Sequence, residues 1–150
     1  MKKLIPVVAI VLILLVALCA CNQQKEPTKI NEPTTPVSDS SVINVSETTI
    51  VLAPTSDYVG QTLLSFMQAS TLKGLLEFTL TNGMVTAING KESTADYSKC
   101  WMLYTSDANM ANTAWGTVEY QGNVYGSAVK GVTELNIIEN GLYIWVYTTF

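Results

Sequence analysis

Residue types that support catalysis are sparse in this chain of 150 residues. It contains no histidine, which removes the commonest general base and the commonest metal ligand. A Ser-His-Asp triad or a Cys-His pair therefore cannot form within the chain. Acidic residues could still supply a carboxylate pair, but no spacing selects one among the candidates Asp96, Asp107, Glu119 and Glu134. We therefore expect that the protein is not an enzyme.

A calcium loop is the one metal site that the sequence suggests. The segment SDANMAN, residues 106–112, offers oxygen atoms from Asp107, Asn109 and Asn112. An EF-hand loop also needs a central glycine and a closing glutamate, and neither stands at the required spacing. Asp and Asn are equally typical of turns, because their side chains bond to nearby backbone groups. We interpret the segment as a turn and expect no metal site.

Aromatic residues are the remaining candidates for binding chemistry. Several stand among glycines within residues 107–131, which we expect to be loop-rich. Large amphipathic rings on loops suit a flat organic ligand or a protein partner. The candidate ligand-binding residues are Trp115, Tyr120, Tyr125 and Tyr104. Packing in the core is the alternative, and we favour it for Phe78, Trp101 and Trp145.

The amino-terminal segment has the pattern of a secretory signal. A cationic head, Met1-Lys2-Lys3, precedes an uncharged apolar run over residues 4–20 that ends in small residues. That run is slightly short for a membrane span of about 20 residues. We expect residues 1–20 to be a signal peptide that directs the chain out of the cytoplasm.

The end of this apolar run, Leu18-Cys19-Ala20-Cys21, resembles the bacterial lipobox. The resemblance implies cleavage before Cys21, which then carries the lipid and anchors the protein to the cell membrane. Lipoproteins of this class carry two or three acyl chains, enough for stable anchoring, whereas one chain holds only marginally. The alternatives are an ordinary cleaved signal and an uncleaved single-span anchor. Cys100 would remain as the one other thiol, and we expect it to be buried beside Trp101.

Composition divides the mature chain into a tether and one domain. Residues 21–42 are rich in Pro, Thr, Ser and Asn, and we expect this segment after the lipidated Cys21 to be a disordered spacer. Residues 43–150 are long enough for one core. The chain is acidic and has no arginine, so it lacks the basic patch that nucleic-acid binding needs. We therefore expect no nucleic-acid partner.

Strand patterns dominate the domain. Residues 43–53 are rich in β-branched residues and predict a strand pair or one long strand. Asn82-Gly83, between two alternating apolar runs, predicts a β-hairpin, and a second Asn-Gly pair follows at residues 89–90. Further strands are predicted at residues 101–106, 133–138 and 141–150.

One helix is predicted between these strands. Ser56 or Asp57 is the predicted N-cap and Gly74 the predicted stop. Its apolar face is spaced at helical intervals and consists of Val59, Leu63, Phe66, Met67 and Ser70. The expected fold is therefore α+β: a small β-rich domain with one helix packed on a mixed or antiparallel sheet, in a β-grasp-like arrangement.

Four motifs in this order resemble the transcobalamin-like C-terminal domain. They are a helical Thr-Leu-Leu-x-x-Met at residues 62–67, the Gly-x-Val-Thr-x-Ile-Asn-Gly pattern at 83–90, Trp-Met-x-Tyr at 101–104, and a closing strand with Gly141, Trp145 and Tyr147. The resemblance covers about residues 43–150. The turn after the Trp-Met strand and the residues before the closing strand depart from the family pattern.

The resemblance implies a binding function. Members of this family include the second domain of cobalamin carriers, which implies that a corrinoid is a candidate ligand here and that an uptake system, such as a transporter, is a candidate partner. We expect the chain to act without the first domain of those carriers, so that a lone module would cover only one face of a corrinoid. The alternative is a surface interaction module that binds a protein or polysaccharide of the cell envelope and no small molecule.

Overall fold

The computed structural model describes residues 28–29 and 41–150. The predicted signal peptide, Cys21 and most of the predicted tether lie outside these residues. Among the described residues, no helix has the length and apolar character needed to cross a membrane. Two residues of the predicted tether, Thr28–Lys29, form the short strand β1.

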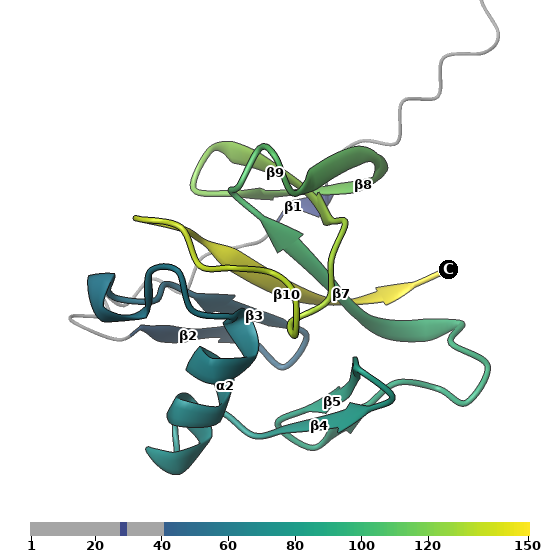
Figure 1. Ribbon diagram of the computed structural model, residues 1–150. Coiled ribbons are helices and arrows are strands. Elements are labelled where there is room, and N and C mark those ends of the chain that lie inside the picture. The colour runs from purple at the N-terminus through teal and green to yellow at the C-terminus, as the bar shows by residue number, and fades with distance from the viewer. Residues whose placement is uncertain (1–27, 30–40) are drawn as a thin grey trace, which may run out of the picture.

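A curved seven-stranded sheet forms the body of the molecule (Figure 1). Across the sheet its strands are β1, β8 (Ala111–Tyr120), β9 (Asn123–Ala128), β7 (Lys99–Thr105), β10 (Tyr143–Thr149), β3 (Thr49–Leu52) and β2 (Val42–Ser46). All neighbours pair antiparallel except β1, which runs parallel to β8. With the single helix among the described residues, this arrangement is α+β, as predicted.

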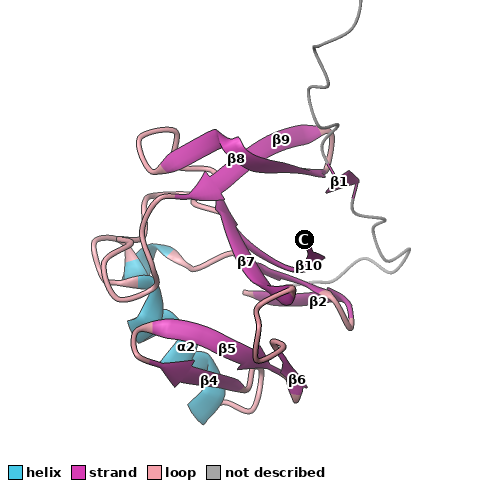
Figure 2. Ribbon diagram, turned by 90° about the vertical axis from the view of Figure 1, so that its right-hand side faces the viewer, coloured by secondary structure: helices cyan, strands magenta, loops and turns pink. Residues whose placement is uncertain are grey.

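A second, smaller sheet lies at the other end of the molecule from the β8–β9 hairpin (Figure 2). It consists of β4 (Phe78–Thr81), β5 (Met84–Ile88) and β6 (Lys91–Glu92). Asn82 and Gly83 join β4 to β5 with φ of 51° and 81°, the left-handed values that a two-residue hairpin turn requires. Asn89 and Gly90 repeat this geometry between β5 and β6. Both Asn-Gly predictions are confirmed.

The predicted helix exists but begins later than expected. Helix α2 spans Leu63–Leu72, and its N-cap is Thr62, whose hydroxyl accepts a hydrogen bond from the Ser65 amide. The predicted caps Ser56 and Asp57 are wrong, because they begin a separate 3-10 turn, η1 (Ser56–Tyr58). Gly74, with φ of 69°, ends the helix as predicted.

The buried face of α2 follows the predicted spacing. Leu63, Phe66, Met67 and Ser70 are buried, whereas Val59 lies before the helix and is exposed. The helix packs on the side of the large sheet where Ile50, Leu52, Trp101, Leu103, Tyr143 and Trp145 alternate inward, together with Val85 and Ile88 of the small sheet. The core positions predicted for Trp101 and Trp145 are confirmed.

The opposite side of the large sheet carries its own apolar cluster. The intervening residues of the same strands lie there, among them Val51, Ile144 and Val146. Val118 of β8 and three tyrosines complete this cluster: Tyr104, Tyr120 and Tyr125.

Two segment predictions are wrong. Residues 107–131 are not a loop-rich stretch, because β8 and β9 form a hairpin there around a Gln121-Gly122 turn that lacks the favoured asparagine. Residues 133–138 are not a strand. Leu135 and Ile137 are buried beside α2. The backbone of Ile137 bonds to Gly60 and Gln61 before the helix, and that of Leu135 bonds to Gly131 and to Leu63, the first residue of α2, so neither residue pairs in a sheet.

This irregular segment has a structural purpose. The Leu135 carbonyl accepts from the Leu63 amide at 2.8 Å, and the Val132 carbonyl accepts from the Leu64 amide at 3.0 Å. The first amides of a helix have no partner within the helix. The segment therefore supplies the acceptors that the first turn of α2 needs, which fixes the helix on the sheet.

Candidate functional site

An apolar groove lies where the small sheet meets the large one. We call it the inter-sheet groove; its volume is about 310 Å³. One wall comes from β5 and the segment after β6, with Met84, Val85 and Tyr97. The other comes from the end of β9 and the following loop, residues 127–132, while β7 and β10 lie between the walls with Trp101 and Trp145.

Exposed apolar side chains gather at this groove. Met84 is 53% exposed, Tyr97 45% and Val129 40%. Single exposed apolar residues are ordinary on protein surfaces, whereas several around one depression are typical of a binding surface. Three of them around one depression, above two tryptophans, make this groove the best candidate site among the described residues.

Trp101 is held rigidly in the groove. Its indole Nε1 donates to the Lys91 carbonyl at 2.7 Å, and its ring meets Tyr147 edge to face at 5.4 Å between centroids. The Tyr147 hydroxyl donates to the Glu92 carbonyl, also at 2.7 Å. These two bonds attach β6 to the large sheet, so that the groove between the sheets is largely pre-formed.

Trp145 provides an unusual polar group in this region. The residue is buried, and its indole Nε1 has no hydrogen-bond partner. Tryptophan N–H groups usually find a partner when buried, because an unmade bond costs free energy. The donor lies on a side chain that lines the groove.

The ionisable side chains at the groove contribute little charge to it. Cys100, expected to be buried, is only half-buried, and burial raises the pKa of its thiol. Lys130 at the rim is paired with Glu134 at 2.9 Å, with both side chains well exposed. Apolar contact therefore dominates the chemistry that the groove offers, with Ser93 and Ser127 as polar lining residues.

The sequence-predicted site residues do not line this groove. The loop placement of Trp115, Tyr120 and Tyr125 is wrong, because the first two lie within β8 and the third in β9. Tyr104, Tyr120 and Tyr125 come together in the cluster opposite α2, where each is at most 8% exposed. Burial raises the pKa of the Tyr104 and Tyr125 hydroxyls.

These tyrosines leave little aromatic surface for a ligand. Tyr125 contributes to a shallow depression of about 540 Å³ that Thr113 and Val124 also line. Trp115 is the exception, since its side chain is 60% exposed. A ligand-binding role for the four residues stays a prediction.

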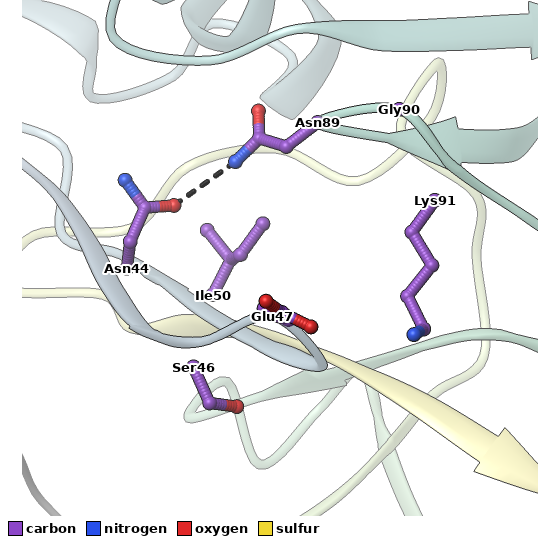
Figure 3. A pocket seen from close by; sticks show the side chains of 7 residues that line it. All are labelled: Asn44, Ser46, Glu47, Ile50, Asn89, Gly90 and Lys91. Atoms are coloured by element: carbon purple, nitrogen blue, oxygen red, sulfur yellow. Dashed lines mark hydrogen bonds between the residues drawn. The ribbon is translucent and has the colours of Figure 1, made fainter.

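A more polar depression lies between the two sheets on the side of the β2–β3 hairpin (Figure 3). Its volume is about 510 Å³, and its lining combines the apolar Ile50 with polar side chains that include Glu47 and Lys91. The amide of Asn89 bridges the sheets: its Nδ2 donates to Asn44 Oδ1 at 3.0 Å, and its Oδ1 accepts from the Glu77 amide at 2.9 Å.

The acidic candidates occupy separate local structures. Asp96 accepts from Ser98 in a turn, Asp107 accepts from the Asn109 amide, and Glu134 binds Lys130. The turn interpretation of Asp107 and Asn109 is thereby confirmed. Among the described residues, no three side chains of the His, Cys, Asp and Glu types gather where they could hold a metal ion.

The sequence alone does not single out the groove residues Met84, Tyr97 and Val129. Met84 follows the Asn-Gly turn directly, and Tyr97 has a positive φ of 56°, which is rare for a bulky residue. An exposed methionine at a hairpin and an aromatic residue in a turn were the available signals. The sequence could not indicate that these segments lie near Val129.

Comparison with known proteins adds no relative. No family model matches the chain, and no curated protein and no solved structure match it significantly.

Proposed function

We propose that the protein is a membrane-anchored binding lipoprotein outside the cytoplasm. In this proposal Cys21 carries the lipid, and the inter-sheet groove binds a small, flat organic ligand for presentation to an uptake system. One observation carries the ligand proposal: Met84, Tyr97 and Val129 are exposed around a groove that Trp101 and Trp145 also line.

The groove suits a ring more than a charged molecule. Its apolar residues gain free energy by excluding water from a ligand, at about 25 cal/mol for each Å² buried. Trp101 is buried and is held by its hydrogen bond and by Tyr147, so it forms a fixed base for the groove, while the exposed side chains of Met84, Tyr97 and Val129 supply the contact surface. A volume of about 310 Å³ lies at the small end of ligand sites.

A corrinoid of the cobalamin type is the first ligand to test, since the four sequence motifs imply it. A groove of this size would hold only one edge of a corrinoid. A lone domain should therefore bind the vitamin weakly, and a second protein, such as a transporter subunit, would complete the site.

Titration of the chain without residues 1–21 with cobalamin tests the ligand proposal, followed by calorimetry and by the visible spectrum of the vitamin. We expect saturable binding that M84S and Y97S both weaken. L72S is the matched control, because Leu72 is 91% exposed on α2 and lies outside the groove. Absence of binding up to about 1 mM, equivalent to roughly −4 kcal/mol, would exclude cobalamin as a ligand of the domain alone.

Replacement of Cys21 tests the anchor. Cys21→Ser should release the protein from the membrane or leave the precursor unprocessed. Unchanged processing and unchanged membrane retention would refute the lipobox interpretation.

A second candidate function is favoured by the depression in Figure 3. Its amide, carboxylate and ammonium groups offer the mixed donors and acceptors that a polysaccharide or protein surface would satisfy. In a pull-down from cell envelopes, recovery of a transporter subunit would favour ligand uptake. Recovery of an envelope polymer would favour this second function.

We also propose that the α+β domain is β-grasp-like. The order of hairpin β2–β3, helix α2 and a sheet completed by β10 supports it. The antiparallel pairing of β3 with β10 departs from the parallel central pair of that fold.

A further inference from the structure

Strand β8 carries a segment that projects from the ladder. Asn112 pairs with Ser127 of β9 and Thr117 with Gly126, so residues 113–116 have no partner in β9. The Asn112 Oδ1 accepts from the Ala114 amide at 2.9 Å and supports the start of this projection. At its end stands Gly116, whose φ of 133° is a value that glycine readily adopts.

Trp115 is the large side chain that this projection presents. Residues 113–115 are all exposed, and Trp115 is 60% exposed, in contrast to Trp101 and Trp145, which are buried. An amphipathic ring held out from a rigid strand is costly in water and suits a surface that is apolar on one side and wet on the other.

The position of β1 relates this projection to the tether. Thr28 pairs with Val118 and Lys29 with Glu119, and the two strands run parallel. The amino end of β1, which leads back to Cys21, therefore points toward the Trp115 end of β8. Trp115 lies three positions before Val118, so at most about 11 Å of chain separates them.

The length of chain before β1 limits how far the domain stands from the lipid. Seven residue steps separate Cys21 from Thr28, and they span at most about 25 Å when fully extended. While β1 is paired, the edge of β8 must therefore remain within this distance of the lipidated residue. A free tether of residues 21–42 would not impose this limit.

We propose that the bilayer surface is the partner of Trp115, which inserts among the lipid headgroups while β1 keeps β8 close to the membrane. This inference rests on the proposed lipid anchor at Cys21. Tryptophan is enriched at membrane interfaces because its ring is apolar and its N–H can still bond to water or headgroups. The small sheet, with Met84 of the inter-sheet groove, lies at the opposite end of the molecule and would stay open to solvent (Figure 2).

Quenching by brominated lipid tests this proposal on the full lipidated protein. The protein is placed in phosphatidylcholine vesicles with bromine near the headgroup end of the acyl chains, and vesicles are recovered by flotation. We expect bromine to reduce the emission of one tryptophan of the three. W115F should abolish this reduction, and L72A, which changes an exposed side chain on α2, should leave it intact.

Variants of β1 test the role of the strand. Proline at both Thr28 and Lys29 removes two amides and blocks strand pairing. We expect this double variant to float with the vesicles but to show weaker quenching. Equal quenching in the double variant would overturn the role of β1.

The outcomes separate the inference from the anchor. Protein that does not float refutes the anchor and this inference with it. Protein that floats but shows no bromine effect, or the same effect in W115F, overturns the insertion of Trp115 and leaves the anchor standing. In that case Trp115 faces water, a protein or a sugar instead of the bilayer.

Discussion

The two buried tryptophans permit a matched comparison of the same substitution. W101F and W145F remove the same atoms from side chains that are each 5% exposed on the same side of the sheet. The cost of the cavity left by the smaller ring is therefore similar at both sites. The two sites differ in the indole N–H, which donates to the Lys91 carbonyl in Trp101 and has no partner in Trp145.

The hydrogen bonding of the two indole N–H groups sets the expected difference in stability between W101F and W145F. W101F loses a hydrogen bond worth about 1 kcal/mol net. W145F removes an unpaired buried donor, which relieves a penalty of about 1–3 kcal/mol. W101F should therefore have a free energy of unfolding lower than that of W145F by about 2–4 kcal/mol, the sum of the two terms.

Urea unfolding of the chain without residues 1–21, followed by far-UV circular dichroism, measures this difference without relying on tryptophan emission. With slopes of about 1–3 kcal/mol per M, the urea midpoint of W101F should lie about 0.7–4 M below that of W145F. Equal midpoints, or a lower midpoint for W145F, would refute the assignment of an unpaired donor to Trp145. The midpoints report stability only if both variants show the same slope of unfolding free energy against urea concentration.

Three further outcomes are expected. G83A should lower the free energy of unfolding by about 1–2 kcal/mol in the same urea experiment, because φ of 81° is strained for an L-residue. G131A is the control and should have little effect, because an added Cβ there meets only an ordinary contact; equal losses for the two variants would contradict this. Hydrogen bonds from Thr94 and Ser98 lower the pKa of Asp96 to about 2, so its carboxylate stabilises the fold above about pH 4, and this contribution is lost as the pH falls toward 2. An NMR titration of the Asp96 carboxyl checks this, and a midpoint near 4 would contradict it. Because burial raises the pKa of Cys100, its alkylation by iodoacetamide at pH 8 should be slower in the folded chain than in urea; equal rates would show that the thiol is not shielded.

Local sequence signals located most of the secondary structure. The Asn-Gly pairs specified both turns of the small sheet, because asparagine and glycine tolerate the positive φ that these turns need. The helical spacing of Leu63, Phe66 and Met67 identified the face of α2 that is buried. The start of the helix was predicted too early because Ser56 and Thr62 are both good caps, and contacts from residues 132–135 determine which one is used.

The candidate site was less accessible to sequence reasoning. The glycines near Tyr120 and Tyr125 predict loops. In the structure these residues belong to the paired strands β8 and β9, which place both rings in a core cluster. The sequence indicated aromatic residues of interest without indicating which would be exposed, since exposure depends on the segments that cover each face.

The sequence by itself determined the absence of histidine chemistry, the apolar amino-terminal segment with its Cys21 motif, and the turns and alternating strands of an α+β domain. These follow from residue type and from backbone preferences that act over a few residues. Only the tertiary structure decided that Met84, Tyr97 and Val129 surround one groove and that β1 lies beside the strand of Trp115. Such contacts join segments far apart in the chain, and strand pairing and burial of the shared core select them.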